Sequence, residues 1–171
     1  MRIRRTPATI AVVVLACGAL AATALAFSTG GTQIQMINQE SAAAASTSAL
    51  VWTDLAPSAV SVTVPANSTR LINARFTAES GCAGPNAGRC LARIIAVNAG
   101  GGFVELSPIT ADFMFDTDVA GLTDDGSEGN AMERSRRLPA GTWRIVVQRM
   151  VTNATTSFVV DDWHHAVEVS A

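Results

Sequence analysis

Apolar side chains recur at every second position through much of the chain after residue 48. In Ile72–Ala78 each odd position is polar and each even position is apolar, and Val60–Val64 alternates in the same way. In a later segment, Trp143, Ile145 and Val147 form the inward face. A period of two is typical of strands with one buried face. Clusters of Gly, Pro and Asn between these segments indicate turns.

About eight or nine short strands are expected in roughly 120 residues. Cys90–Val97 is apolar on both faces except at Arg93, which favours a central strand. No segment shows a convincing helical period, so residues 49–171 are predicted to form an antiparallel β-sandwich of Greek-key or jelly-roll type. The expected strands are 60–64, 72–78, 90–97, 103–106, 111–117, 131–138, 143–147, 157–160 and 163–169.

Residues 1–26 have the order of a secretory signal peptide: three Arg, an uncharged stretch, and small residues before Phe27. We therefore expect cleavage before Phe27 and a secreted or cell-envelope protein. Two alternatives stay open, a retained membrane anchor and lipidation at Cys17. Residues 27–48 are rich in Ser, Thr, Gln and Ala, and we interpret them as a flexible linker.

Removal of the leader changes the charge balance. All 14 acidic residues follow residue 26, whereas only 9 of the 12 Arg do, so the mature chain carries 9 − 14 = −5. Nucleic acids and anionic membranes bind clustered positive charge, so this balance excludes them as favoured partners. The hydrophobic content of 49% excludes a disordered chain.

Cleavage would also leave two cysteines. Cys82 and Cys90 flank a short segment rich in Gly, Pro and Asn that can bend back on itself. In an exported protein this arrangement predicts a disulfide. A redox pair or a metal site is the alternative, although the Cys-x-x-Cys spacing is absent.

Five strings carry a family resemblance: ARFTAES (Ala74–Ser80), the cysteine pair, MERS (Met132–Ser135), LPAGTW (Leu138–Trp143) and FVVDDWHHAVEV (Phe158–Val169). Together they resemble a family of small exported β-sandwich proteins from high-GC Gram-positive bacteria, over most of residues 50–170. The resemblance implies export and a jelly-roll-like domain. It transfers no catalytic residue.

The densest polar cluster is Asp161–His165. On a strand, Asp162, His164 and Glu168 would share one face, an arrangement able to hold a divalent ion. We favour the simpler interpretation, in which the two Asp form a bend, Trp163 is core and the His side chains are partly exposed.

The acidic segment after residue 115 offers oxygen ligands for calcium. It departs from the EF-hand pattern because Ala120 stands where a third ligand belongs. We therefore expect no cofactor and keep calcium as the alternative. The metal candidates are Asp116, Asp118, Asp124, Asp125 and Glu128.

The chain shows no nucleophile elbow, and no spacing selects a catalytic carboxylate pair. We predict a non-enzymatic binding protein for a cell-envelope glycan or protein. Alternatives are a secreted hydrolase of glycans or peptides using His164 or His165, and a structural or assembly subunit. Trp143, Phe76, Phe113 and Phe115 occupy positions expected to be buried, which leaves as candidate ligand-binding residues Trp52, Trp163, His164 and His165.

Overall fold

The computed structural model describes residues 32–86, 88–109, 113–118 and 127–171, which fall within one compact unit of the chain. The regular structure of these residues is strand, and every strand pair is antiparallel, which confirms the all-β expectation. No helix long and apolar enough to span a bilayer occurs among them. The strands are β1 Gln33–Ser41, β2 Ala45–Thr47, β3 Thr53–Asp54, β4 Val60–Ala83, β5 Gly88–Asn98, β6 Phe103–Glu105, β7 Met114–Asp118, β8 Glu128–Val151 and β9 Ser157–Ser170.

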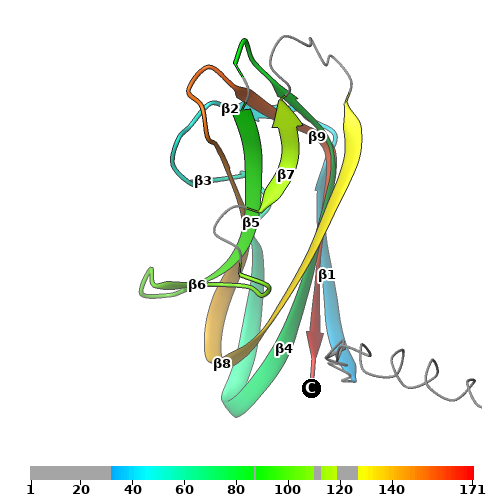
Figure 1. Ribbon diagram of the computed structural model, residues 1–171. Coiled ribbons are helices and arrows are strands. Elements are labelled where there is room, and N and C mark those ends of the chain that lie inside the picture. The colour runs from blue at the N-terminus through cyan, green and yellow to red at the C-terminus, as the bar shows by residue number, and fades with distance from the viewer. Residues whose placement is uncertain (1–31, 87, 110–112, 119–126) are drawn as a thin grey trace, which may run out of the picture. The chain divides into compact units, whose positions relative to one another are not determined.

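Two strands, β4 and β8, are 24 residues long each and pair with one another on both sides of a sharp bend. The register shifts between Val64 and Thr69, where Asn67 has a φ of 58°. Opposite this bend, Gly141 has a φ of 144°. Asn and Gly tolerate positive φ better than other residues, so both strands can turn here without ending. Figure 1 shows the two strands reaching the bottom of the view and turning back.

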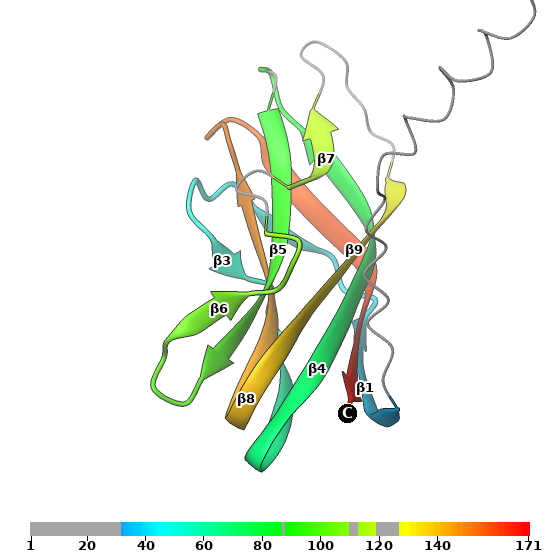
Figure 2. The same ribbon diagram turned by 60° about the horizontal axis from the view of Figure 1, so that its bottom comes forward.

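The bent ribbon of β4 and β8 belongs to both layers of a sandwich (Figure 2). Layer 1 consists of β1, β9, residues 69–83 of β4 and residues 128–139 of β8, in that order. Layer 2 consists of residues 60–64 of β4, residues 141–151 of β8, β5 and β6, with β3 beside β8 and β7 beside β5. The sequence predicted separate strands on each side of residues 65–68 and 139–142; the structure joins them.

The inner faces of the two layers form one apolar core. Phe115 of layer 2 lies 5.5 Å from Phe76 and 6.1 Å from Phe158, both of layer 1, between ring centroids. These contacts join the two layers, as expected for a sandwich. The largest fully buried apolar side chains are Trp163, Phe76, Phe158, Leu55, Ile72, Ile94, Leu106, Leu138, Ile145, Val62 and Val64.

The segment interpreted as a linker, residues 27–48, contains β1 and β2 in its described part, and both pair with β9. Only Ile37 of β1 and Ala45 of β2 pack against the core. Backbone hydrogen bonds to β9 therefore hold this segment in place. Such bonds do not require apolar and polar side chains to alternate, so the sequence gives no sign of these strands.

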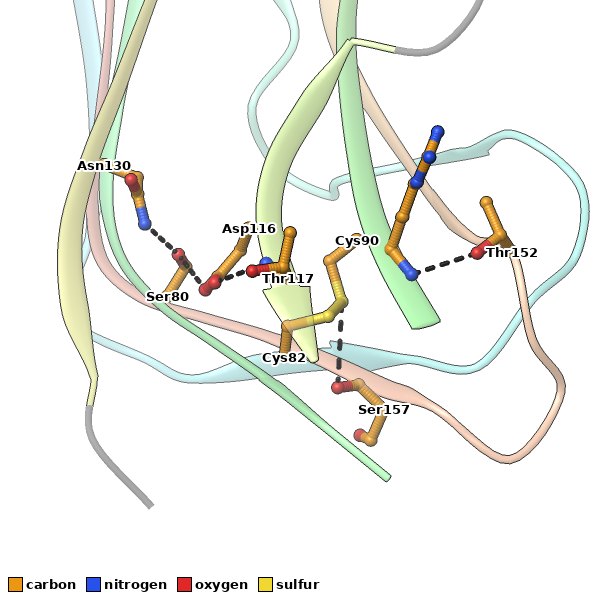
Figure 3. The surroundings of a disulfide bond; sticks show 9 residues. Ser80, Cys82, Cys90, Asp116, Thr117, Asn130, Thr152 and Ser157 are labelled. Atoms are coloured by element: carbon orange, nitrogen blue, oxygen red, sulfur yellow. Dashed lines mark hydrogen bonds between the residues drawn. A yellow bond between two sulfur atoms is a disulfide. The ribbon is translucent and has the colours of Figure 1, made fainter. Parts of the chain in front are cut away.

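Cys82 and Cys90 form a disulfide with a Cα–Cα distance of 5.9 Å, in agreement with the sequence expectation (Figure 3). The bond joins the end of β4 to the start of β5, and both residues are buried. Nearby, Ser80 Oγ donates a hydrogen bond of 2.7 Å to Asp116 Oδ2 and accepts one of 2.9 Å from Asn130 Nδ2. The disulfide and these two hydrogen bonds therefore hold β4, β5, β7 and β8 together at this end of the sandwich.

Gly88 at the start of β5 has no room for a side chain. A Cβ there would overlap Oγ1 of Thr156, which is fully buried. We expect Gly88→Ala to destabilise the fold by about 1–3 kcal/mol, because overpacking forces buried neighbours to move. Urea denaturation measures the loss, and Gly81→Ala, where a Cβ meets nothing within 4 Å, is the matched control. Equal midpoints for the two variants would contradict the prediction.

Candidate functional site

Two aromatic rings and an arginine lie together on the outer face of layer 2. The Cζ atom of Arg93 is 4.4 Å from the ring centroid of Trp52 and 5.2 Å from that of Phe103. Trp52 is half-buried, whereas Phe103 is 55% exposed. Both distances fall within the range of cation–π attraction. We call these three residues the arginine–aromatic patch.

Three separate segments build this patch. Arg93 lies in the middle of β5, where its side chain points away from the core because its neighbours Ala92 and Ile94 point inward. Trp52 immediately precedes β3, which pairs with β8, and Phe103 begins β6, which pairs with β5. The patch therefore depends on the pairing of layer 2.

The turn before Phe103 is held by one side chain. Asn98 Oδ1 accepts hydrogen bonds from the backbone N–H groups of Gly100 (2.9 Å) and Gly102 (3.0 Å). Gly101 between them has a φ of 81°, a conformation that glycine adopts at little cost. This turn fixes the direction in which β6 leaves β5 and thus the position of Phe103.

Two polar side chains pair with the arginine of the patch. Arg93 Nε donates a hydrogen bond of 2.8 Å to Gln148 Oε1, and its Nη1 lies 3.4 Å from Glu105 Oε2. Gln148 Nε2 in turn donates a 2.8 Å hydrogen bond to Asp54 Oδ1. Burial lowers the pKa of Arg93, and the carboxylates of Glu105 and Asp54 oppose that shift. Carboxylates therefore balance the charge of the guanidinium, which contacts both rings.

Apolar side chains lie on both sides of this polar row. Leu91, Ile95 and Val146 are buried although they lie outside the main core cluster. Three large apolar side chains near these residues are exposed to solvent. Leu50 (52% exposed) and Val51 (68%) precede Trp52, and Met114 (47%) pairs with Leu91.

The other candidate ligand-binding residues from the sequence lie elsewhere, on β9. Trp163 is 2% exposed and His165 is 0% exposed, so both are core residues in this structure. His164 points to the outer face, where it lines a hollow of about 230 Å³ with Glu40 and Asp162. Asp162 has a φ of 42° and stands at a register shift of β9 against β4. The structure therefore separates Trp52 from the three candidates on β9.

His165 is enclosed between the layers. Its Nδ1 is 2.8 Å from the backbone oxygen of Ser58, so Nδ1 carries the proton and donates it to that carbonyl. Its Nε2 is buried without a hydrogen-bond partner. Burial lowers the pKa of His165; the Ser58 hydrogen bond opposes this shift and His164 adds to it. The side chain is neutral and structural.

Two arginines are also buried in the described part of the chain. Burial lowers the pKa of Arg149 to about 10, and its Nη1 donates a 2.7 Å hydrogen bond to the carbonyl of Ala45 in β2. The guanidinium of Arg134 lies 4.0 Å from the ring centroid of Phe113, and burial lowers its pKa too. Phe113, which the sequence predicted to be buried, is half-buried. These arginines hold segments of the chain in place.

Of the metal candidates from the sequence, the structure describes the side chains of Asp116 and Glu128. Asp124 and Asp125 lie outside the described residues, as does the side chain of Asp118. Asp116 accepts the Ser80 hydrogen bond, and it lines a hollow of about 190 Å³ with Glu128 and four other residues. Within the described residues, no group of three His, Cys, Asp or Glu side chains is placed to hold a metal ion.

Sequence reasoning found Trp52 but missed Phe103 as its partner. The signal for the patch was Arg93, the one charged residue of the otherwise apolar segment Cys90–Val97. A charge at that position needs partners on the outer face of the sheet, and an exposed aromatic residue is one of the partners available to arginine. The contribution of Gln148 and Asp54 depends on strand pairing, which the sequence does not reveal.

No protein-family model matches the chain, and no curated protein matches it. Among solved structures, the chain is similar to a carbohydrate-binding module of a Cellvibrio mixtus lichenase in complex with cellotriose. The identity is 15%, the TM-score is 0.30, and the match covers 82% of this chain and 98% of that one. A second similar structure is that of infectious bursal disease virus, Gx strain, at 10% identity and a TM-score of 0.35, covering 82% of this chain and 38% of that one. At these TM-scores the assignment of the β-sandwich rests on the chain's own strand pairing.

Proposed function

We propose that this protein is an exported, non-enzymatic β-sandwich that binds a neutral glycan of the cell envelope on the arginine–aromatic patch. One observation carries the proposal: of the three tryptophans, only Trp52 is not buried, and it shares its contact with Arg93 with the exposed ring of Phe103. Export follows from the leader, and the Cys82–Cys90 disulfide is consistent with an oxidising compartment.

The chemistry of the patch suits a sugar. A sugar ring has an apolar face that packs on an aromatic ring, and hydroxyl groups around its rim that need hydrogen-bond partners. Glu105, Asp54 and Gln148 supply such partners beside the rings. Because Arg93 is already paired with Glu105, the patch offers no free positive charge for an acidic polymer.

The rings are also held in advance of binding. Arg93 contacts both rings, and Gln148 and Glu105 hold Arg93. Side chains that are already ordered lose less entropy when a ligand binds, which raises affinity. Two rings that Arg93 already contacts are suited to a polymer that passes over the surface.

The test is binding of the purified full chain to cellulose, xylan, chitin and peptidoglycan, measured by pull-down and by titration with soluble fragments of whichever polymer retains it. We expect Trp52→Ala and Phe103→Ala each to weaken binding at least about ten-fold, which corresponds to about 1.4 kcal/mol. Ile109→Ala is the matched control, because Ile109 is 58% exposed and follows Ser107, which bridges to β8 in layer 1.

Urea denaturation of each variant separates loss of the ligand surface from loss of the fold. Retention on none of the four polymers would reject the proposal. Equal binding by the wild type and both aromatic variants would reject the patch as the binding surface.

A further inference from the structure

The strand β1 leaves one edge of layer 1 open. It pairs with β9 on one side and ends the strand order, and no other strand among the described residues pairs with its far edge. The strand has nine residues, and from Gln35 to Ser41 its register with β9 is unbroken. Such an edge presents a row of backbone N–H and C=O groups to any strand that can pair with them.

The other outer strands of the described sheet are protected in the usual ways. β2, β3, β6, β7 and residues 60–64 of β4 are two to five residues long. Residues 128–139 of β8, which form the other edge of layer 1, carry five charged side chains. Short length and charged side chains both discourage pairing with a second molecule. β1 has neither protection, since Glu40 is its one charged residue and it contains no Pro, Lys or Arg. Ile34 and Met36 are 54% and 53% exposed on it.

We propose that β1 pairs with β1 of a second copy of this chain, antiparallel and about a two-fold axis at Ile37. This register places Gln35 opposite the second copy's Gln39, and Met36 opposite its Asn38. Residues opposite one another in an antiparallel pair share a face of the sheet. Odd-numbered residues then lie opposite odd-numbered residues, and even opposite even. The inner face of layer 1 in one copy therefore continues into the inner face of layer 1 in the other.

Charge and side-chain chemistry favour a second copy as the occupant. The two Glu40 side chains would stand six residues apart, about 20 Å along the strands, which exceeds the Debye length at physiological salt. A parallel pairing would place them side by side. The amides of Gln35 and Gln39 each carry a donor and an acceptor, so the pair is complementary to itself. A basic peptide would find only one carboxylate along β1.

Sedimentation and light scattering of the full chain over a dilution series provide the first test. We expect a mass twice that of one chain, falling to the single mass on dilution. A single mass at every concentration up to the sub-millimolar range overturns the proposal. This measurement involves no glycan, so its outcome is independent of the proposed function.

Charge variants test the register. In the double variant Met36→Lys with Asn38→Lys, like charges lie directly opposite across the two-fold axis, and we expect at least a ten-fold loss of dimer affinity. Met36→Glu with Asn38→Glu is expected to do the same. An equimolar mixture of the two double variants should recover the dimer as a mixed pair, because positions 36 and 38 then carry opposite charges.

Ala131→Lys is the matched control, because Ala131 is an exposed residue of β8 on layer 1, away from the β1 edge. It should leave the dimer intact. Circular dichroism and urea midpoints of every variant show whether β1 still pairs with β9. A dimer that tolerates both double variants, or folded double variants that do not recover a dimer on mixing, would each overturn the β1 pairing.

Discussion

Replacement of Cys82 and Cys90 together by alanine is expected to lower the free energy of unfolding by about 2–5 kcal/mol. The disulfide closes a short loop, with a sequence separation of 8. Loss of the cross-link gives the unfolded chain more conformations, which accounts for about 2–3 kcal/mol in the chain-entropy model. Both side chains are buried in the core cluster, so their truncation also leaves unfilled space.

Urea denaturation with and without reductant measures this loss. The wild type in reductant should approach the midpoint of the double variant, while the variant itself should not respond to reductant. Ser80, two residues from Cys82, bonds with Asp116 and Asn130 at the same end of the sandwich, so Ser80→Ala is a useful comparison that leaves the disulfide intact. If the double variant unfolds at the same urea concentration as the wild type, the disulfide does not stabilise the fold.

Acidification is expected to destabilise the protein through His165. Burial lowers the pKa of His165 in the folded state, so below the ordinary value near 6.5 the unfolded chain binds a proton that the folded chain does not. The stabilising difference is complete above that value. It decreases by about 1.4 kcal/mol for each pH unit of acidification, until the pH reaches the pKa of the folded state.

Comparison of His165→Asn with the wild type isolates this contribution. Asparagine does not titrate, and its amide N–H can replace Nδ1 as the donor to the Ser58 carbonyl. We expect the unfolding free energies of the two proteins to converge as the pH falls from 7.5 toward 4.5. His164→Asn removes the half-buried neighbour that adds the smallest contribution to the shift, so most of the pH dependence should remain. A constant difference between wild type and His165→Asn at all pH values would contradict this assignment.

The sequence predicted the β-sandwich because its core strands bury one face and therefore alternate. The burial of Phe76, Phe115 and Trp143 followed from that alternation, and the structure confirms it. The alternation of apolar and polar residues did not predict β1. This strand is stabilised by pairing with β9, and backbone pairing produces no periodic pattern in the sequence. Alternation also failed at residues 65–68, where Pro and Asn are typical of a chain reversal, but here they bend a continuous strand.

The candidate site was harder to predict than the fold. Trp52 was identified because few aromatic residues remained after the core was filled. Its neighbours Arg93 and Phe103 come from β5 and β6, and their proximity depends on which strands pair. For His165 the prediction was wrong. A histidine next to aspartates in the sequence suggests a solvent-exposed polar site, and the side chain was therefore expected to be partly exposed. The period of two instead points its side chain inward with Trp163 and Val167.

The bend shared by β4 and β8 affects how the molecule can come apart. In a sandwich whose layers are joined only by loops, one layer can detach while the other keeps its hydrogen bonds. Here β4 and β8 run from one layer into the other, so a continuous pair of hydrogen-bonded strands joins the two layers. We expect the body of this protein to open all at once, without a stable half-opened form.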